Sequence, residues 1–166
     1  MSKALLLLTH VNGSLDRLSL RGLSAALLLD QECTGLLINA NQAVVAEALE
    51  YLPQLIPLQC SSETDLLPEQ IAPILRDLIS LKGFSHIMAT DGELARASLP
   101  RAAALCGAAC LSGITGVLGS TRFSRDLLAG NASVVATSHT PVTFIILRDT
   151  HLATPQKLSQ RGQKIT

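Results

Sequence analysis

The sequence has few aromatic residues and no excess of charge of either sign. Its 166 residues include no Trp, one Tyr and three Phe, and Lys+Arg and Asp+Glu number 13 each. A stacking platform for single-stranded nucleic acid needs aromatic side chains. Attraction to nucleic acid or to an anionic membrane needs a net positive charge. The composition therefore argues against nucleic acid as a partner.

Long apolar runs and the common ligand-binding motifs are missing too. The first apolar run, at residues 3–9, is much too short to span a bilayer, so we expect no membrane insertion. The sequence has no G-x-x-x-x-G-K-[ST] and no G-x-S-x-G motif. Segment 10–14 holds one glycine, where a dinucleotide site needs G-x-G-x-x-G. These absences argue against a P-loop, a dinucleotide site and a serine-hydrolase elbow.

The cysteines form no metal-binding motif. Cys106 and Cys110, spaced C-x3-C, are far in sequence from Cys33 and Cys60, and the four histidines are scattered. A structural zinc site needs clustered ligands, so we predict no metal site and reduced thiols packed as small hydrophobic groups. Reduced thiols and the lack of a visible targeting segment favour a bacterial cytoplasm, with the mitochondrial matrix as the alternative.

Hydrophobic residues, at 48%, are plentiful enough to fill the core of one domain. Apolar runs at 3–9, 34–38 and 86–89 predict strands, the first of them buried on both faces, and 55–58 predicts a weak strand interrupted by Pro57. The spacing of apolar residues predicts a helix after each of these strands. The first is capped by Ser14, the next two are 42–52 and 68–82, and the last extends from Thr90 or Asp91 to Leu105. Pro100 should kink or split this last helix. This alternation predicts a mainly parallel, three-layer α/β sheet.

The second half follows another pattern. Residues 110–117 are apolar with two glycines. Residues 122–128, 133–137 and 142–147 are strand-like, and short turns separate these three segments. Such spacing is typical of hairpins, so we expect an antiparallel C-terminal section. Residues from 151 onward are polar and predict a solvated tail, which divides the chain into an α/β domain at 1–150 and a tail at 151–166.

Polar residues near the expected carboxyl ends of the strands are the candidates for a binding pocket, because ligands of open α/β sheets bind at this edge. They are Thr9, His10, Asn12, Thr90, Asp91, Ser112 and Thr115. A helix cap explains Asp91 without chemistry, and Asp91 and Glu93, two positions apart, do not share a helix face. His86, in mid-strand, is predicted to be a satisfied core histidine. We assign no catalytic, cofactor-binding or metal-binding residue.

Several motifs together resemble the N-terminal domain of the electron transfer flavoprotein alpha subunit. They are LPRAAAL at 99–105, LSGITGV at 111–117, AGNA at 129–132 and VTFIILR at 142–148, preceded by an apolar strand with His10, Asn12 and Leu15. In that family the corresponding motifs are a leucine-proline-arginine helix, an isoleucine-serine-aspartate-valine-threonine run, an alanine-glycine-asparagine-alanine turn and a strand ending in threonine-valine-arginine. The resemblance extends from residue 3 to residue 148.

The sequence also departs from this family. Gly113 stands where the family usually has aspartate, Ala95 replaces a glycine although Arg96 keeps the adjacent charge, and residues 147–150 match only in part. The family continues into a second domain that carries most of the flavin contacts. No position in the 166 residues matches the family's flavin-binding motifs, so none is carried over.

The resemblance implies an adenine nucleotide alpha hydrolase-like fold and a scaffold role. In the family, the alpha subunit pairs with a beta subunit in a heterodimer. That heterodimer carries electrons from flavin dehydrogenases, such as the acyl-CoA dehydrogenases of fatty acid beta-oxidation, toward the quinone pool. We therefore expect an electron-carrier domain without a catalytic site, which holds no cofactor while FAD is bound elsewhere. The apolar helix at 23–29 is the expected dimerisation surface.

Two other functions stay open at this point. One is a stand-alone adenine-nucleotide-binding α/β module, because the fold is related to such domains, although segment 10–14 lacks their glycine-rich loop. The other, ranked last, is a hydrolase that uses His10 with Asp91.

Overall fold

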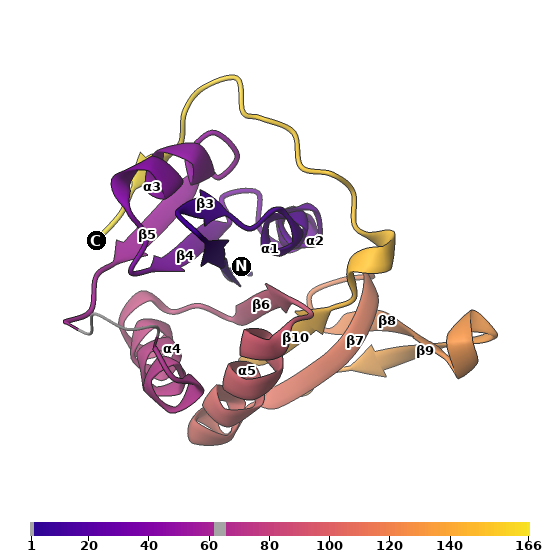
Figure 1. Ribbon diagram of the computed structural model, residues 1–166. Helices are drawn as coiled ribbons and strands as arrows, with labels where there is room; N and C mark the ends of the chain where they lie inside the picture. The colour runs from indigo at the N-terminus through magenta and orange to yellow at the C-terminus, as the bar shows by residue number, and fades with distance from the viewer. Residues whose placement is uncertain (1, 62–65) are drawn as a thin grey trace.

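The computed structural model of the protein describes residues 2–61 and 66–166 and contains one large sheet with helices on both faces (Figure 1). In chain order the elements are β1 (Ala4–Leu7), β2 (His10–Val11), β3 (Ser14–Leu15), α1 (Arg17–Arg21), α2 (Leu23–Leu29), β4 (Thr34–Ile38), α3 (Gln42–Ala48), β5 (Gln54–Leu58), α4 (Pro68–Lys82), β6 (His86–Thr90), α5 (Glu93–Cys106), β7 (Ala109–Val117), β8 (Arg122–Leu127), η1 (Leu128–Gly130), β9 (Ala132–Thr137), β10 (Thr143–Leu147), η2 (Asp149–His151) and β11 (Gln163–Lys164).

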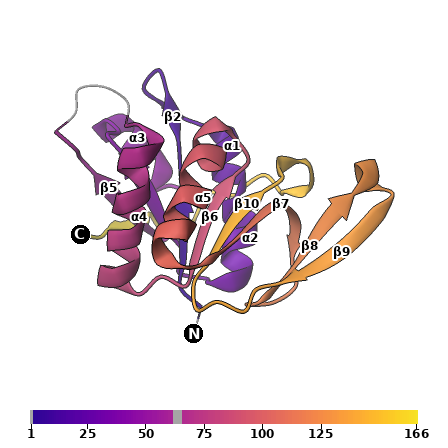
Figure 2. The ribbon, with the colours of Figure 1, turned by 90° about the horizontal axis from the view of Figure 1, so that it is seen from below.

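The sheet has the strand order β11-β5-β4-β1-β6-β10-β7-β8-β9. From β11 to β7 every neighbouring pair is parallel, with Leu5 of β1 aligned to Thr34 of β4 and to Ile87 of β6. Strands β7, β8 and β9 form an antiparallel meander that reaches away from the helices (Figure 2). The predicted fold class, a mainly parallel α/β sheet with an antiparallel section, is confirmed.

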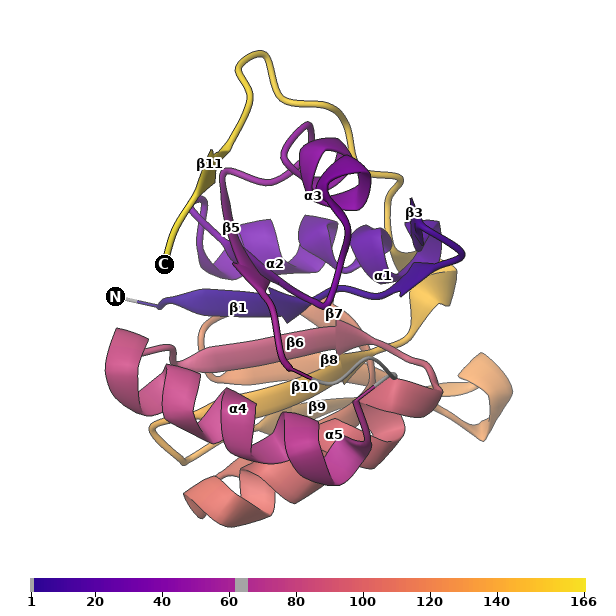
Figure 3. The same cartoon turned by 60° about the vertical axis from the view of Figure 1, so that its left-hand side comes forward.

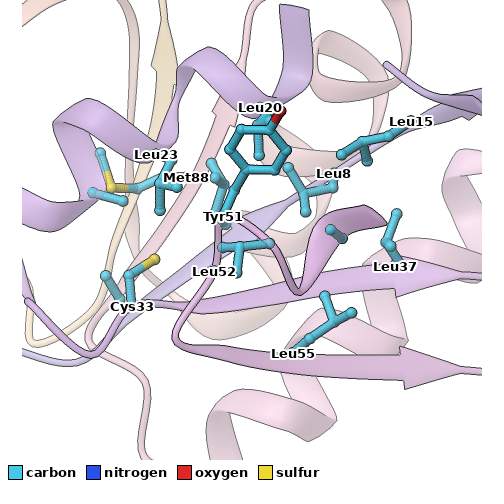
Figure 4. Close-up of a cluster of buried hydrophobic side chains, with 14 of the residues drawn as sticks. Leu8, Leu15, Leu20, Leu23, Cys33, Leu37, Tyr51, Leu52, Leu55 and Met88 are labelled. Carbon is cyan, nitrogen blue, oxygen red and sulfur yellow. The ribbon is translucent and has the colours of Figure 1, made fainter. Parts of the chain in front are cut away.

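Two apolar cores lie on the two faces of the sheet, because successive strand residues point to opposite faces. Leu5 and Leu7 of β1 pack toward α4 and α5, while Leu6 packs toward α1, α2 and α3. Figure 3 shows these two helical layers on either side of the strands. Figure 4 shows part of the second core, where Tyr51, Leu52 and Met88 lie among leucines.

The expected hairpin between the last two long strands is wrong. Strand β10 does not pair with β9; it returns to the middle of the sheet and lies parallel between β6 and β7. All five of its residues are buried. Four of the five are apolar. Because only a central position removes both faces of a strand from water, burial of these residues favours insertion into the sheet over an edge hairpin.

The first helix also differs from its prediction. Ser14 belongs to β3, and Asp16 caps α1 by accepting a hydrogen bond from the Leu18 amide at 3.0 Å. The helix then breaks at Gly22 into α1 and α2. A Cβ on Gly22 would lie 2.8 Å from Leu6 Cδ1 and 3.0 Å from Thr90 Oγ1, so the missing side chain lets this turn lie close against the central strands.

Helix α5 corrects two further expectations. Neither Thr90 nor Asp91 is its cap, since Gly92 takes that position without a side-chain hydrogen bond. Pro100 does not divide the helix, which continues from Glu93 to Cys106. Pro100 is on the exposed face, where water can satisfy the backbone carbonyl that loses its partner, and buried Leu99 and Ala102 hold the helix against the sheet.

The polar C-terminal segment is attached to the sheet and is not a freely solvated tail. Strand β11 pairs in parallel with β5, and Lys157 forms an ion pair of 2.6 Å with Glu50. The carbonyls of Pro53 and Leu55 accept hydrogen bonds from Gln163 and Ile165. Most side chains of this segment are exposed. The segment therefore contributes mainly backbone hydrogen bonds to β5 and little apolar burial. The boundary at residue 150 stays a prediction.

Candidate functional site

A groove of about 620 Å³ lies at the carboxyl ends of β1 and β4. The first turns of α4 and α5 form its opposite wall. Its lining consists of Leu7, Leu8, Thr9, His10, Val11, Ile38, Asn39, Leu66, Pro68, Ile71, Glu93, Leu94 and Ala97. The groove is thus mainly apolar, and Glu93 is its one charged lining residue among those described.

His10 and Asn39 line this groove, and each has one side-chain polar atom in a hydrogen bond. His10 Nε2 is 2.9 Å from the carbonyl oxygen of Ile38. Because a carbonyl only accepts, Nε2 carries the proton and cannot act as a base in this arrangement. Asn39 has a left-handed backbone (φ 53°), and its Oδ1 accepts a 2.7 Å hydrogen bond from the Cys60 amide.

A smaller cavity of about 200 Å³ lies between the ends of β1 and β6, where the strand order reverses. Its polar residues bind one another. Thr9 Oγ1 donates to Asp16 at 2.7 Å, the Thr9 amide donates to Ser19 Oγ at 3.1 Å, and Thr90 Oγ1 donates to the Ser19 carbonyl at 3.3 Å. This network joins α1 to two strands and uses the polar atoms that a ligand would need.

Asp91, at the rim of the smaller cavity, is held by an arginine of the helix that follows it. Arg96 donates from Nε and Nη2 to the two carboxylate oxygens at 2.7 and 3.0 Å. The hydrogen bond from Arg96 lowers the pKa of Asp91, with smaller contributions from the charges of Arg96 and Arg148. Asp91 is therefore a fixed anion and a poor acid or base near neutral pH.

The structure brings together only some of the predicted pocket residues. Thr9, Thr90 and Asp91 line the smaller cavity, and Thr9 and His10 line the larger one. Asn12 lies in the exposed turn between β2 and β3. Ser112 and Thr115 lie on β7, where Thr115 Oγ1 donates to the Ser124 carbonyl at 3.3 Å. These three residues line neither cavity.

Sequence reasoning missed the groove wall formed by Ile38, Asn39, Pro68 and Ile71. Asn39 ends a strand in the same way as the polar residues that were singled out, so strand-end position was an available signal. Pro68 and Ile71 carried no such signal, because only the packing of α4 against the sheet places them beside β1.

The remaining titratable candidates have structural roles. His86 is buried, with Nδ1 2.9 Å from Ser85 Oγ and Nε2 2.7 Å from the Ser120 carbonyl, which confirms it as a satisfied core histidine. Burial raises the pKa of the Cys33, Cys106 and Cys110 thiols. Within residues 2–61 and 66–166 no three His, Cys, Asp or Glu side chains gather as metal ligands.

This geometry supports neither of the two other functions. The crevice at the strand-order reversal is below the roughly 300–1,000 Å³ of ordinary ligand pockets, and its carboxylates Asp16, Asp91 and Glu93 would repel a phosphate. His10 and Asp91 line different cavities, and each is bound to another group. The arrangement holds elements together and offers no paired acid and base.

The fold and the site define an α/β domain of the doubly wound type whose carboxyl edge is stabilised by its own polar groups. Comparison with known proteins assigns the family within this class. The chain belongs to the electron transfer flavoprotein domain family, which matches residues 4–166. The match includes β11 and the segment that leads to it.

Individual relatives agree with this assignment. The chain is 30% identical over 149 residues to the electron transfer flavoprotein subunit alpha of Pseudomonas aeruginosa, covering 88% of this chain and 48% of that protein. It is 30% identical over 155 residues to a probable mitochondrial subunit alpha of Caenorhabditis elegans, covering 90% and 46%. A probable mitochondrial subunit alpha of Schizosaccharomyces pombe is 27% identical over 148 residues, covering 87% and 43%.

The chain therefore spans less than half the length of these curated relatives, and it corresponds to their N-terminal part. The relatives include bacterial and mitochondrial proteins. In the part of the chain that the structure describes, no helix is long and apolar enough to cross a bilayer.

Proposed function

We propose that these residues form the N-terminal structural domain of an electron transfer flavoprotein alpha subunit, which binds the beta subunit and holds no redox group of its own. The family match over residues 4–166 carries this proposal. The site geometry supports it, because the polar groups at the carboxyl edge bind one another and leave no phosphate cradle. FAD is then bound by other parts of the complex.

In this role the domain contributes binding and orientation, while the flavin supplies the redox chemistry. Electrons would pass from flavin dehydrogenases, such as the acyl-CoA dehydrogenases, through the complex to the quinone pool. The three partly buried or buried thiols with raised pKa are compatible with a reducing compartment. We place the protein in a bacterial cytoplasm, with the mitochondrial matrix as the alternative.

The surface we propose for the beta subunit is the β8–β9 arm, defined as residues 122–137. Strand β9 is the last strand of the sheet, so one of its edges has free backbone donors and acceptors. Leu127, Val134 and Val135 are exposed on this arm, and Val134 and Val135, as neighbours in a strand, face opposite sides. Edge pairing together with apolar contacts is a common way to join two chains.

Helix α2, the surface expected from the sequence, is less suited to docking. Leu23 and Ala26 are buried, Leu27 and Leu29 pack partly against the core, and Leu28 alone is strongly exposed, at 71%. Its run of leucines therefore serves mainly the protein's own core.

Native mass spectrometry of the chain mixed with the beta subunit tests the proposal. We expect a one-to-one complex at micromolar concentration, weakened about tenfold or more by Val135→Asp, because a buried unpaired charge is costly at an interface. Leu28→Asp is the matched control and should bind normally. Absence of a complex for the unaltered chain would remove the proposal, and loss of binding only with Leu28→Asp would move the interface to α2.

A further inference from the structure

Two arginine side chains meet at a second place in the fold. Strand β7 has a bulge at Gly113, where the backbone is left-handed (φ 67°) and the pairing with both β10 and β8 shifts register nearby. A Cβ placed on Gly113 would lie 3.5 Å from Cδ of Arg125 on β8 and 3.8 Å from Nη2 of Arg148, which follows β10. Two arginine side chains from the two neighbouring strands thus converge over a residue that has no side chain.

Neither arginine is satisfied by the rest of the described protein. Arg125 Nε is buried and has no hydrogen-bond partner, and Arg125 Nη1 makes only a long contact of 3.4 Å to the Ser112 carbonyl. The side chain of Arg148 has no hydrogen bond or ion pair within the described ranges, although its amide donates to the Ile114 carbonyl. A buried N–H without an acceptor is unfavourable, and so is the approach of two like charges.

The nearby carboxylates of Asp91 and Asp126 do not bind the guanidinium groups of these two arginines. Arg148 acts on Asp91 only through the field of its charge, because both carboxylate oxygens of Asp91 are bound by Arg96. Asp126 follows Arg125 in the same strand, so it points to the opposite face of β8. By contrast, Arg17 and Arg76 each form an ion pair with an acid, at 2.9 and 2.8 Å.

We propose that Arg125 and Arg148 form a binding site for a single oxyanion above Gly113. Guanidinium groups hold carboxylate and phosphate oxygens through paired N–H donors, and such charge-assisted hydrogen bonds are among the strong ones. The missing side chain at Gly113 leaves room for the group, and the buried Nε–H of Arg125 gains an acceptor. The oxyanion is either a free anion or a carboxylate from a partner chain.

Titration of the isolated chain with inorganic phosphate at constant ionic strength, followed by amide NMR, tests the site. We expect saturable shifts at residues 113, 125 and 148, and binding about tenfold weaker in Arg148→Gln, which loses one charge-assisted contact. Arg122→Gln is the control, since Arg122 is an exposed arginine at the start of the same strand. Equal binding by all three proteins would overturn the site.

A second pair of variants tests the site without added ligand. Gly113→Asp places a carboxylate beside both arginines, whereas Gly113→Asn has nearly the same shape and a similar tolerance for a left-handed backbone. We expect the Asp variant to melt at a higher temperature than the Asn variant at low salt and to bind no phosphate. Equal melting temperatures would contradict the proposal even if phosphate shifts were seen.

The source of the oxyanion is decided by repeating the titration in the complex with the beta subunit. If phosphate binding to Arg125 and Arg148 is lost there, a carboxylate of the partner occupies the site; if it persists, the ligand is a free anion. The variants at Gly113 need no partner, so their outcome is independent of whether the proposed subunit pairing holds.

Discussion

The ion pair of Asp91 and Arg96 joins the end of β6 to the first turns of α5. The Asp91 amide also donates to the Leu147 carbonyl at 2.7 Å, so this residue fixes the chain where it leaves the sheet. The Arg96 side chain is 69% exposed, and solvent screens much of the attraction. The pair therefore orients the start of the helix more than it stabilises the whole fold.

Asp91→Asn should lower the free energy of unfolding by about 1 kcal/mol or less at pH 7. Because the folded-state pKa of Asp91 lies below its ordinary value near 3.8, its contribution is complete above that value. It is lost as the pH falls through the lowered folded-state pKa. Urea unfolding of both proteins from pH 7 to pH 2 measures this difference.

The partner residue provides the control. Arg96→Gln should cost about the same as Asp91→Asn, and the double variant should lose little more than either single change, since the two residues act through one interaction. Fully additive losses, or a difference that persists unchanged at the lowest pH, would show that Asp91 acts by some other contact.

At the scale of elements, Gly162 is the point at which the C-terminal segment meets the body of the sheet. A Cβ on this residue would clash with the backbone carbonyl of Leu52 and lie 2.9 Å from the Pro53 carbonyl oxygen. Backbone atoms of this kind cannot rotate away as a side chain can. Strand β11 therefore depends on a residue without a side chain.

Gly162→Ala should release β11 while the rest of the sheet stays folded. The amides of Gln163 and Ile165, which donate to Pro53 and Leu55, should then exchange with solvent at least about tenfold faster. Hydrogen exchange followed by mass spectrometry or NMR measures this directly. Gly119→Ala is the control because a Cβ there meets nothing within 4 Å; protection that survives in Gly162→Ala would contradict this role.

Most helices and strands could be predicted because local patterns of apolar residues in the sequence indicate them. The buried runs at β1, β4 and β6 and the apolar face of α4, with Gly83 at its left-handed end, need no distant partner to be identified. The place of β10 was not predictable in this way. The short connection between β9 and β10 favours a hairpin. The opposing indication is that β10 is buried on both faces, and this depends on which other strands form the sheet.

The candidate site was less predictable than the fold. Strand-end position correctly brought Thr9, Thr90 and Asp91 together. It failed for Ser112 and Thr115, because β7 pairs with β10 and so lies two strands away from β6. Gly22 and Gly162 carried no such signal, since the close contacts that a Cβ would make there arise only from the tertiary fold.

At the scale of the whole molecule, the residues at the carboxyl edge stabilise the fold and form no reactive site among those described. Two apolar cores pack on the two faces of the sheet, and a hydrogen-bond network joins α1 to its carboxyl edge. At the carboxyl edge of the sheet, its described residues offer no cradle for a phosphate and no paired acid and base. We therefore infer that this domain presents surfaces, at the β8–β9 arm and above Gly113, to groups that other chains or domains supply.

The flavin content of the purified chain, measured from its visible absorbance and after denaturation, tests this central claim most directly. We predict a colourless protein without flavin, which becomes part of a flavin-containing complex only when the other components are present. A yellow protein with one flavin per chain and no companion chain would contradict the claim.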